Sequence, residues 1–140
     1  MILLRAPLIE IRDTGTPKGL GVFAVSGFLG GDIVELCPVV VFCAPYDSLP
    51  ESIQQRIFDW TALARQEPDM QALALGYGSM YNSANPANMR YELEETGKFL
   101  RFTAVCNITA GEELTINYSG DGGSESKDDD WFHTNGIKLI

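Results

Sequence analysis

The chain has 140 residues, of which 45% are hydrophobic and 21% are charged, and its formal net charge is −9. This length is enough for one domain with a core of its own, and the composition is that of an ordinary globular protein. The acidity argues against direct nucleic-acid binding, which usually needs a basic surface, and it suits a basic peptide partner.

The apolar segments are too short, and too often interrupted by polar residues, to cross a membrane. None has the length of a membrane span. The start of the chain, MILLRAPLIEIRD, alternates apolar with polar residues, unlike the apolar stretch of a signal peptide. We therefore expect no membrane association, while composition leaves homodimerisation open.

No two of the three cysteines are spaced as in a CxxC motif. They are Cys37, Cys43 and Cys106. An odd number without a CxxC motif indicates neither a disulfide framework nor a zinc site. We expect free thiols, no bound metal and a reducing, cytoplasmic location. The one histidine, His133, falls in the tail and is expected at the surface.

Short strands and one helix are predicted in the first half of the chain. Alternation predicts a strand over residues 2–12, a glycine-rich loop follows over residues 14–21, and residues 22–25 predict a second strand. Residues 33–42 are rich in β-branched side chains but contain Pro38, which predicts two short strands or an edge strand.

The helix is expected over residues 49–65. Ser48 and Glu51 have the spacing of a capping box, and a proline lies early in the first turn. Apolar residues then follow at helical intervals. They are Ile53, Ile57 and Trp60.

The second half of the chain predicts a hairpin and a further strand. Residues 88–95 and 98–106 have strand character and are joined by Thr96-Gly97. Gly111 sets a turn before the strand expected over residues 114–118. Many short strands with Gly and Pro turns and a single helix predict a mostly-β fold.

Two segments are candidates for ligand binding. In Lys18-Gly19-Leu20-Gly21 the glycines let the backbone approach a ligand, although a tight turn explains this loop equally well. The second segment, residues 77–88, carries hydroxyl and amide groups among small residues, which suits a pocket for a polar molecule. A plain turn is the alternative, because Asn, Ser and Pro favour turns. The polar residues of this segment include Tyr77, Tyr81, Asn82, Asn85 and Asn88.

Together with residues 111–118, GEELTINY, these segments resemble in sequence order the SET-domain protein lysine methyltransferases. An ungapped alignment places Asn82 and Asn88 on the two asparagines of the family motif, and Ser83 where the family has His. A shifted alignment would place Asn82 on the His and Pro86 on the family Pro. The flanking residues favour the ungapped alignment.

The resemblance implies a SET fold, a mostly-β, β-clip-like arrangement of small sheets with a knot-like C-terminal segment and one inserted helix. It implies a single domain over residues 1–140, with a variable insert that carries the helix over residues 32–80 and an acidic, post-SET-like tail over residues 119–140. The implied activity is transfer of a methyl group from S-adenosylmethionine to a lysine of a basic protein or peptide.

The resemblance also assigns residues to the site. Tyr118 is implied to be catalytic, because its hydroxyl and nearby carbonyls would orient the amine and the methyl group. The cofactor would contact Lys18, Gly19, Leu20, Gly21, Met80, Tyr81, Asn82, Ser83 and Trp131. The substrate channel would be lined by Tyr77, Tyr81, Phe102 and Tyr118. The tail residues Asp128, Asp129 and Asp130 are expected near the entry for a basic peptide.

Loss of the family His leaves a second interpretation open. Ser83 offers the same backbone groups as the His but not the imidazole, which puts cofactor affinity in question more than the fold. The chain would then be a SET-fold binding module with weak or no methyl transfer.

Overall fold

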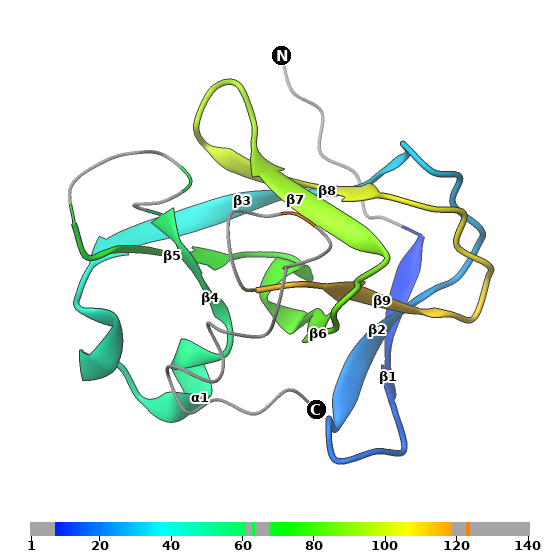
Figure 1. Ribbon diagram of the computed structural model, residues 1–140, viewed down its shortest axis with the longest axis horizontal. Coiled ribbons are helices and arrows are strands. Elements are labelled where there is room, and N and C mark those ends of the chain that lie inside the picture. Colours follow the sequence, from blue (N-terminus) through cyan, green and yellow to red (C-terminus); the bar gives the residue numbers. More distant parts are fainter. Residues whose placement is uncertain (1–7, 61–62, 64–67, 119–122, 124–140) are drawn as a thin grey trace.

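The computed structural model describes residues 8–60, 63, 68–118 and 123, and it contains two β-sheets (Figure 1). The four-stranded sheet has the order β1-β2-β9-β6 and the five-stranded sheet the order β4-β5-β3-β8-β7. The predicted mostly-β fold is therefore confirmed. None of the helices in this described part of the chain is long and apolar enough to cross a membrane.

The strands of the four-stranded sheet are β1 (Ile9–Asp13), β2 (Leu20–Ala24), β9 (Glu113–Ile116) and β6 (Asn82–Ser83). Those of the five-stranded sheet are β4 (Ile57–Asp59), β5 (Met70–Ala74), β3 (Ile33–Cys43), β8 (Phe99–Ala104) and β7 (Met89–Leu93). The helical segments whose bounds lie within the described residues are η1 (Tyr46–Ser48), α1 (Glu51–Gln54) and η2 (Gly78–Met80), and Trp60 and Leu63 are helical as well.

The four-stranded sheet joins segments that are far apart in the sequence. Strands β1 and β2 form an antiparallel hairpin around the glycine-rich loop. Strand β9 then lies between β2, to which it is antiparallel, and β6, to which it is parallel. As a result the glycine-rich loop and residues 82–83 are held on either side of the last described strand.

Strand β3 corrects the prediction made from Pro38. The strand is continuous over eleven residues and lies inside the sheet rather than at its edge. Its first half, up to Pro38, pairs with β8, and its second half, from Val39, pairs with β5. Pro38 lies where the strand changes partners, and its carbonyl accepts a hydrogen bond from the amide of Leu75 at 2.9 Å. A residue without an N–H is tolerated at this changeover because neither ladder runs through it on both sides.

The helix expected over residues 49–65 is only partly formed: residues 51–54, Trp60 and Leu63 are helical, but the expected helix is interrupted between them. Helix α1 has four residues, and residues 57–59 form β4, which pairs with β5. The apolar spacing that predicted the helix does not mark one buried face, because Ile57 is buried while Ile53 is exposed. Burial in a sheet has overridden the helical spacing of these residues.

The expected capping box is not formed either. The residue that precedes α1 is Pro50, which has no side chain able to accept a hydrogen bond. The hydroxyl of Ser48 instead donates to the carbonyl of Pro45 at 2.6 Å. The short helix therefore lacks the side-chain cap that would have favoured a longer one.

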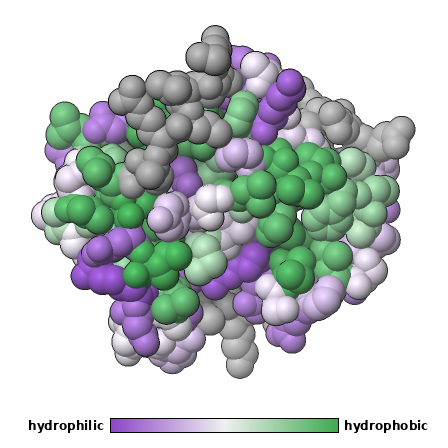
Figure 2. Space-filling view, turned by 180° about the vertical axis from the view of Figure 1, so that it is seen from behind, coloured by the Kyte–Doolittle hydropathy of each residue, from purple (hydrophilic) through white to green (hydrophobic). Residues whose placement is uncertain are grey.

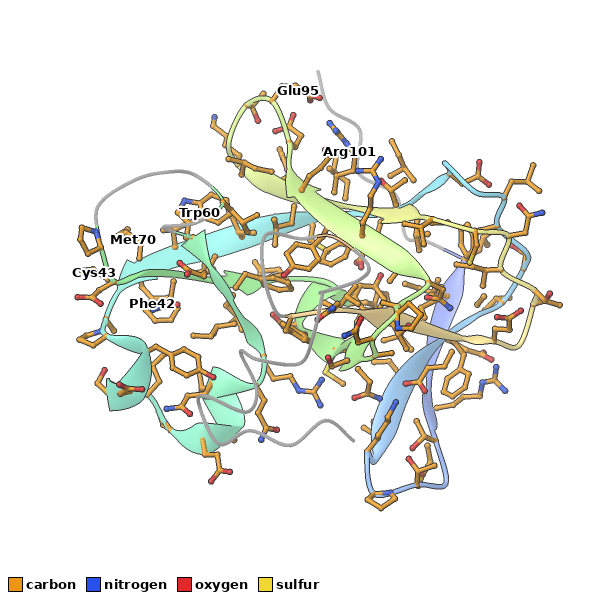
Figure 3. All side chains as sticks on the ribbon, viewed as in Figure 1. Phe42, Cys43, Trp60, Met70, Glu95 and Arg101 are labelled. Atoms are coloured by element: carbon orange, nitrogen blue, oxygen red, sulfur yellow. The ribbon has the colours of Figure 1, made fainter. Side chains whose placement is uncertain are left out.

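The hairpin predicted around Thr96-Gly97 is confirmed by strands β7 and β8. Gly97 has a φ of 77°, a conformation that glycine adopts without strain. Figure 3 shows Arg101 and Glu95 facing each other at this hairpin, where Arg101 Nη2 lies 2.7 Å from Glu95 Oε2. The pair is at the surface, so we expect little stabilisation from it.

An aromatic cluster fills the interior. The ring centroids of Tyr81 and Phe102 are 5.0 Å apart, and those of Phe58 and Tyr91 are 4.9 Å apart. Phe58 also packs against Tyr118, with 5.2 Å between the centroids. The cluster takes its rings from β4, β7, β8 and the segments that carry Tyr81 and Tyr118, so the site rests directly on the core.

The far end of β3 remains exposed to solvent in the described part of the structure. Figure 2 shows apolar side chains gathered on the rear surface, and the exposed apolar residues of this region include Val40, Val41 and Leu75. Val40 and Val41 are neighbours on one strand, so they point to opposite faces of the sheet. Cys43, at the end of the same strand, is an exposed free thiol, as is Cys106, while Cys37 is free and buried.

Candidate functional site

Asn82 connects the two segments that the sequence singled out. Its side-chain nitrogen donates to the carbonyl of Leu20 at 3.0 Å and to Glu113 Oε2 at 2.7 Å. The glycine-rich loop, β6 and β9 are therefore tied together by one buried amide. Among the described residues, no hydrogen bond is donated to the side-chain oxygen of Asn82.

The glycine at position 21 is required by this arrangement. A Cβ atom added to Gly21 would overlap Glu113 Oε2 and would lie 3.0 Å from Asn82 Nδ2. Gly19 is needed for a different reason, because its φ of 76° is one that other residues rarely adopt. Lys18 is half-buried, and Leu20 is exposed beside it. The loop thus combines one sterically confined glycine with one conformationally unusual glycine.

Asn88, the second asparagine of the motif, fixes β9 in place. Its Nδ2 donates to the carbonyl of Glu113 at 2.8 Å, and its Oδ1 accepts from the amide of Thr115 at 2.9 Å. The side chain imitates a neighbouring strand by pairing with a donor and an acceptor of β9. Asn88 therefore has a structural function here.

The hydroxyl of Tyr118 points at the backbone of the Asn82 segment. It donates to the carbonyl of Tyr81 at 3.2 Å. Burial raises the pKa of Tyr118, and the nearby Arg56 opposes this shift only in part. Tyr118 is therefore protonated near neutral pH and acts as a hydrogen-bond donor.

Arg56 reaches the same point from the turn after α1. Its Nη1 donates to the carbonyl of Met80 at 3.3 Å and to that of Tyr81 at 3.4 Å. We use the name carbonyl cluster for these two carbonyl oxygens, the hydroxyl of Tyr118 and the guanidinium of Arg56. Sequence analysis missed Arg56 because the residue lay inside an expected helix and carried no motif of its own.

A buried carboxylate, that of Glu35, holds the side chain of Tyr81, whose carbonyl belongs to the cluster. Glu35 Oε1 accepts from the hydroxyl of Tyr81 at 2.6 Å, and Oε2 accepts from the amide of Tyr77 at 2.9 Å. Burial, and then the charge of Glu35, raise the pKa of Tyr81, so its hydroxyl remains a donor. Tyr81 therefore offers its carbonyl to the cluster, while Glu35 holds its side chain. The role of Glu35 could not be read from the sequence, since 46 residues separate it from Tyr81.

The remaining expected site residues lie in different surroundings. Phe102 is fully buried in the aromatic cluster, and Tyr77 is half-buried. The hydroxyl oxygen of Ser83 is buried and has no hydrogen-bond partner in the part of the chain that the structure describes. Trp131 lies outside the described residues, as do His133, Asp128–Asp130 and nearly all of the expected tail. Their assignments therefore stay predictions.

Chemically, the carbonyl oxygens of the cluster are suited to orienting a polarised, neutral group. Two carbonyl oxygens and a protonated hydroxyl can orient N–H or positively polarised C–H groups. Within the described ranges, no three His, Cys, Asp or Glu side chains gather as metal ligands. The site therefore offers binding and orientation rather than a nucleophile with its own base.

Comparison with known proteins identifies the family. The SET domain model matches residues 19–119. The histone-lysine N-methyltransferase of Schizosaccharomyces pombe that is specific for H3 lysine-37 is 31% identical over 116 residues, which cover 83% of this chain and 76% of that protein. Glu113, whose role the sequence motif alone does not indicate, lies inside the matched range.

Solved structures agree on the fold. The crystal structure of a proposed histone methyltransferase from Plasmodium falciparum superposes with a TM-score of 0.63 and 25% identity, covering 82% of this chain and 96% of that one. An autoinhibited polycomb repressive complex 2 bound to S-adenosylmethionine gives a TM-score of 0.64 at 19% identity, with 84% of this chain covering 16% of that longer chain. The predicted SET fold is thereby confirmed, and the chain belongs to the SET-domain family and is a methyltransferase.

Proposed function

We propose that this methyltransferase transfers the methyl group of S-adenosylmethionine to the side-chain nitrogen of a lysine in a protein. The observation that carries the proposal is the convergence of the Tyr118 hydroxyl with the carbonyls of Met80 and Tyr81, next to the amide that ties β6 to the glycine-rich loop. The named activity of the fungal relative also supports a lysine substrate.

The residues on either side of β9 suit this cofactor. Gly21 is buried and brings its backbone close to the side chains of Asn82 and Glu113, where an added Cβ would overlap Glu113. The amide oxygen of Asn82 and the carboxylate of Glu113 would hold the ammonium group of S-adenosylmethionine, and a polar ligand would satisfy the Ser83 hydroxyl, which has no partner among the described residues. When bound, the cofactor supplies a methyl group on a cationic sulfur.

The side chains of the cluster would orient the reaction. Transfer in line requires the lysine nitrogen to face the methyl group, and the carbonyls of Met80 and Tyr81 are fixed acceptors that favour one geometry. Because burial keeps Tyr118 protonated, its hydroxyl would act as an orienting donor and not as a base. The packing of Phe58 against the ring of Tyr118 would keep this donor in position.

The experiment that tests this proposal has two measurements. Thermal unfolding with and without S-adenosylmethionine should show a rise in Tm that grows with ligand concentration, as mass action requires. Mass spectrometry of a lysine-containing peptide library should then show an added methyl group. Stabilisation without any methylated product would favour the alternative, a SET-fold binding module, and the absence of both results would refute the proposal.

Asn82→Ala should weaken S-adenosylmethionine binding by about 1.5–3 kcal/mol, the range for a hydrogen bond to a charged group. The substitution also removes the contacts with Leu20 and Glu113, so the loop would lose its anchor. Titration calorimetry measures the change. The matched control is Asn107→Ala, which removes an exposed asparagine that accepts from Gly30 at 2.9 Å. Equal affinity of a folded Asn82→Ala protein and the wild type would exclude Asn82 from the cofactor site.

For the substrate we propose a basic, lysine-containing segment of a protein. The net charge of −9 favours such a partner, and the acidic run Asp128–Asp130 would steer its approach. Replacing the three aspartates with asparagines should slow peptide association and weaken its dependence on salt, measured by stopped-flow binding. Unaltered association rates at every salt concentration would show that these aspartates do not steer the peptide toward the site.

For the location we propose the reducing cytoplasm. Cys43 and Cys106 are exposed and unpaired, and exposed thiols persist where the surroundings keep them reduced. Fractionation of cells that express the protein, followed by immunodetection, tests this assignment.

A further inference from the structure

Among the described residues, Arg56 places a positive charge in the site without a carboxylate to balance it. Its guanidinium contacts the carbonyls of Met80 and Tyr81, and the hydroxyl of Tyr118 donates to that same Tyr81 oxygen. Within the described residues, none of the ion pairs includes Arg56. The side chain is half-buried, so solvent screens its charge less than that of a surface arginine.

The proposed reaction needs such a charge. Only the neutral amine of lysine is a nucleophile, and the ordinary pKa of lysine is about 10.4, so less than roughly one amine in a thousand is neutral at pH 7. The nearby hydroxyls do not remove the proton, because burial keeps both Tyr118 and Tyr81 protonated. The carboxylate of Glu35 already accepts two hydrogen bonds, one of them from Tyr81.

We propose that Arg56 is a residue of the active site whose charge, held against the carbonyls of Met80 and Tyr81, makes the lysine that enters beside Tyr118 release its proton before methyl transfer. This inference rests on the function proposed above. The proton goes to water, and the nitrogen lone pair forms the new bond to the methyl carbon. The bond from that carbon to the sulfur breaks, and its electron pair stays on sulfur.

The other titratable groups that the structure describes around this point do not cancel the charge. Glu35 has the opposite sign, but it reaches only the hydroxyl end of Tyr81, whereas Arg56 contacts the carbonyl of that residue. Burial raises the pKa of Cys37, which packs next to Glu35, so this thiol is neutral. Arg56 is also the charged group whose field acts on Tyr118. A like charge a few ångströms away favours the neutral amine, and each unit of pKa increases its neutral fraction tenfold.

The test uses two variants at one position. Arg56→Gln removes the charge but keeps a donor for the carbonyls, and Arg56→Lys keeps the charge. With saturating S-adenosylmethionine and a peptide that the wild type methylates, kcat is measured from pH 6.5 to pH 10. Removing a neighbouring cation raises the pKa of the amine, so the rising limb of the Arg56→Gln profile should move to higher pH. The expected loss is about tenfold or more at neutral pH, with convergence on the wild-type rate at high pH. Arg56→Lys should follow the wild type.

A second measurement is independent of turnover. A peptide whose target lysine carries ¹³C at the ε position is bound to each protein with S-adenosylhomocysteine, and its NMR shift is followed with pH. The bound amine should titrate below the free peptide in the wild type and in Arg56→Lys, and closer to the free peptide in Arg56→Gln.

Three results would overturn the inference. An equal loss of rate at every pH would reduce Arg56 to a structural residue. A faster Arg56→Gln enzyme with a lower KM would mean that Arg56 occupies the place of the lysine and competes with it. Identical NMR titrations in wild type and Arg56→Gln would show that the charge of Arg56 does not change the pKa of the bound lysine. If the wild type methylates no peptide in the library, it is the proposed function that fails, and this inference falls with it.

Discussion

Replacing Tyr118 with phenylalanine is expected to lower the rate of methyl transfer on the order of a hundredfold or more while the protein stays folded. The change removes one hydroxyl, which donates to the carbonyl of Tyr81 at 3.2 Å, and it keeps the ring that packs against Phe58. An interaction made mainly in the transition state lowers kcat without a matching loss of cofactor affinity. Steady-state assays with an accepted peptide, together with calorimetry for S-adenosylmethionine, measure both quantities.

Tyr46→Phe is the matched control for this experiment. The hydroxyl of Tyr46 also donates to a backbone carbonyl at 3.2 Å, that of Gln54, but it lies outside the carbonyl cluster. This variant should therefore retain the wild-type rate. Equal, non-zero rates in Tyr118→Phe and the wild type would end the catalytic assignment of Tyr118. If neither protein transfers a methyl group to any peptide, the binding-module interpretation is favoured instead.

Truncation of Phe102 to alanine is expected to reduce the free energy of unfolding by about 3–5 kcal/mol, the range for a large aromatic residue removed from a core. The ring is fully buried and lies 5.0 Å from that of Tyr81 and 6.0 Å from that of Phe58. The cavity would open directly beneath the carbonyl cluster. Denaturation in urea, followed by fluorescence, measures the loss.

This experiment also separates two roles for Phe102. The resemblance to SET proteins implied a wall of the substrate channel, whereas burial in the aromatic cluster predicts a contribution to stability. Phe23→Ala serves as the control, because Phe23 is half-buried on β2 and covered by Arg12 at 4.4 Å, and its loss should cost less. Unchanged stability of Phe102→Ala with weaker peptide binding would establish the channel role.

Local features of the fold could be predicted from the sequence, and features that depend on distant partners could not. The hairpin at Thr96-Gly97 was predicted because its turn and its two strands are adjacent in the chain. Residues 57–59 were misassigned because their partner, β5, is a separate segment whose pairing no local spacing reveals. The prediction made from Pro38 was wrong for the same reason, because no local sequence pattern shows that a strand changes partners at a proline.

The residues of the site also fall into a group that the sequence could predict and a group that it could not. Gly21, Asn82 and Tyr118 were found because they belong to short motifs that occur in the same order as in a known family. Glu35 and Arg56 lie outside those motifs, and only the fold brings them to Tyr81. Resemblance therefore identified the residues expected to contact cofactor and substrate, while the charges that surround those residues had to come from the structure.

The position of β9 between β2 and β6 also governs when the site can first exist during synthesis. A ribosome makes the chain from its N-terminus at about 5–20 residues per second, and domains fold as their segments emerge. Strand β2 pairs with β1 as soon as both are made, but neither β2 nor β6 reaches β9 until residues 113–116 leave the exit tunnel. Until then Asn82 has no Glu113 to bind, and the carbonyl of Tyr81 has no Tyr118. A released chain that ends before residue 113 should therefore contain all strands of the five-stranded sheet, which end at Ala104, and no capacity to hold the proposed cofactor.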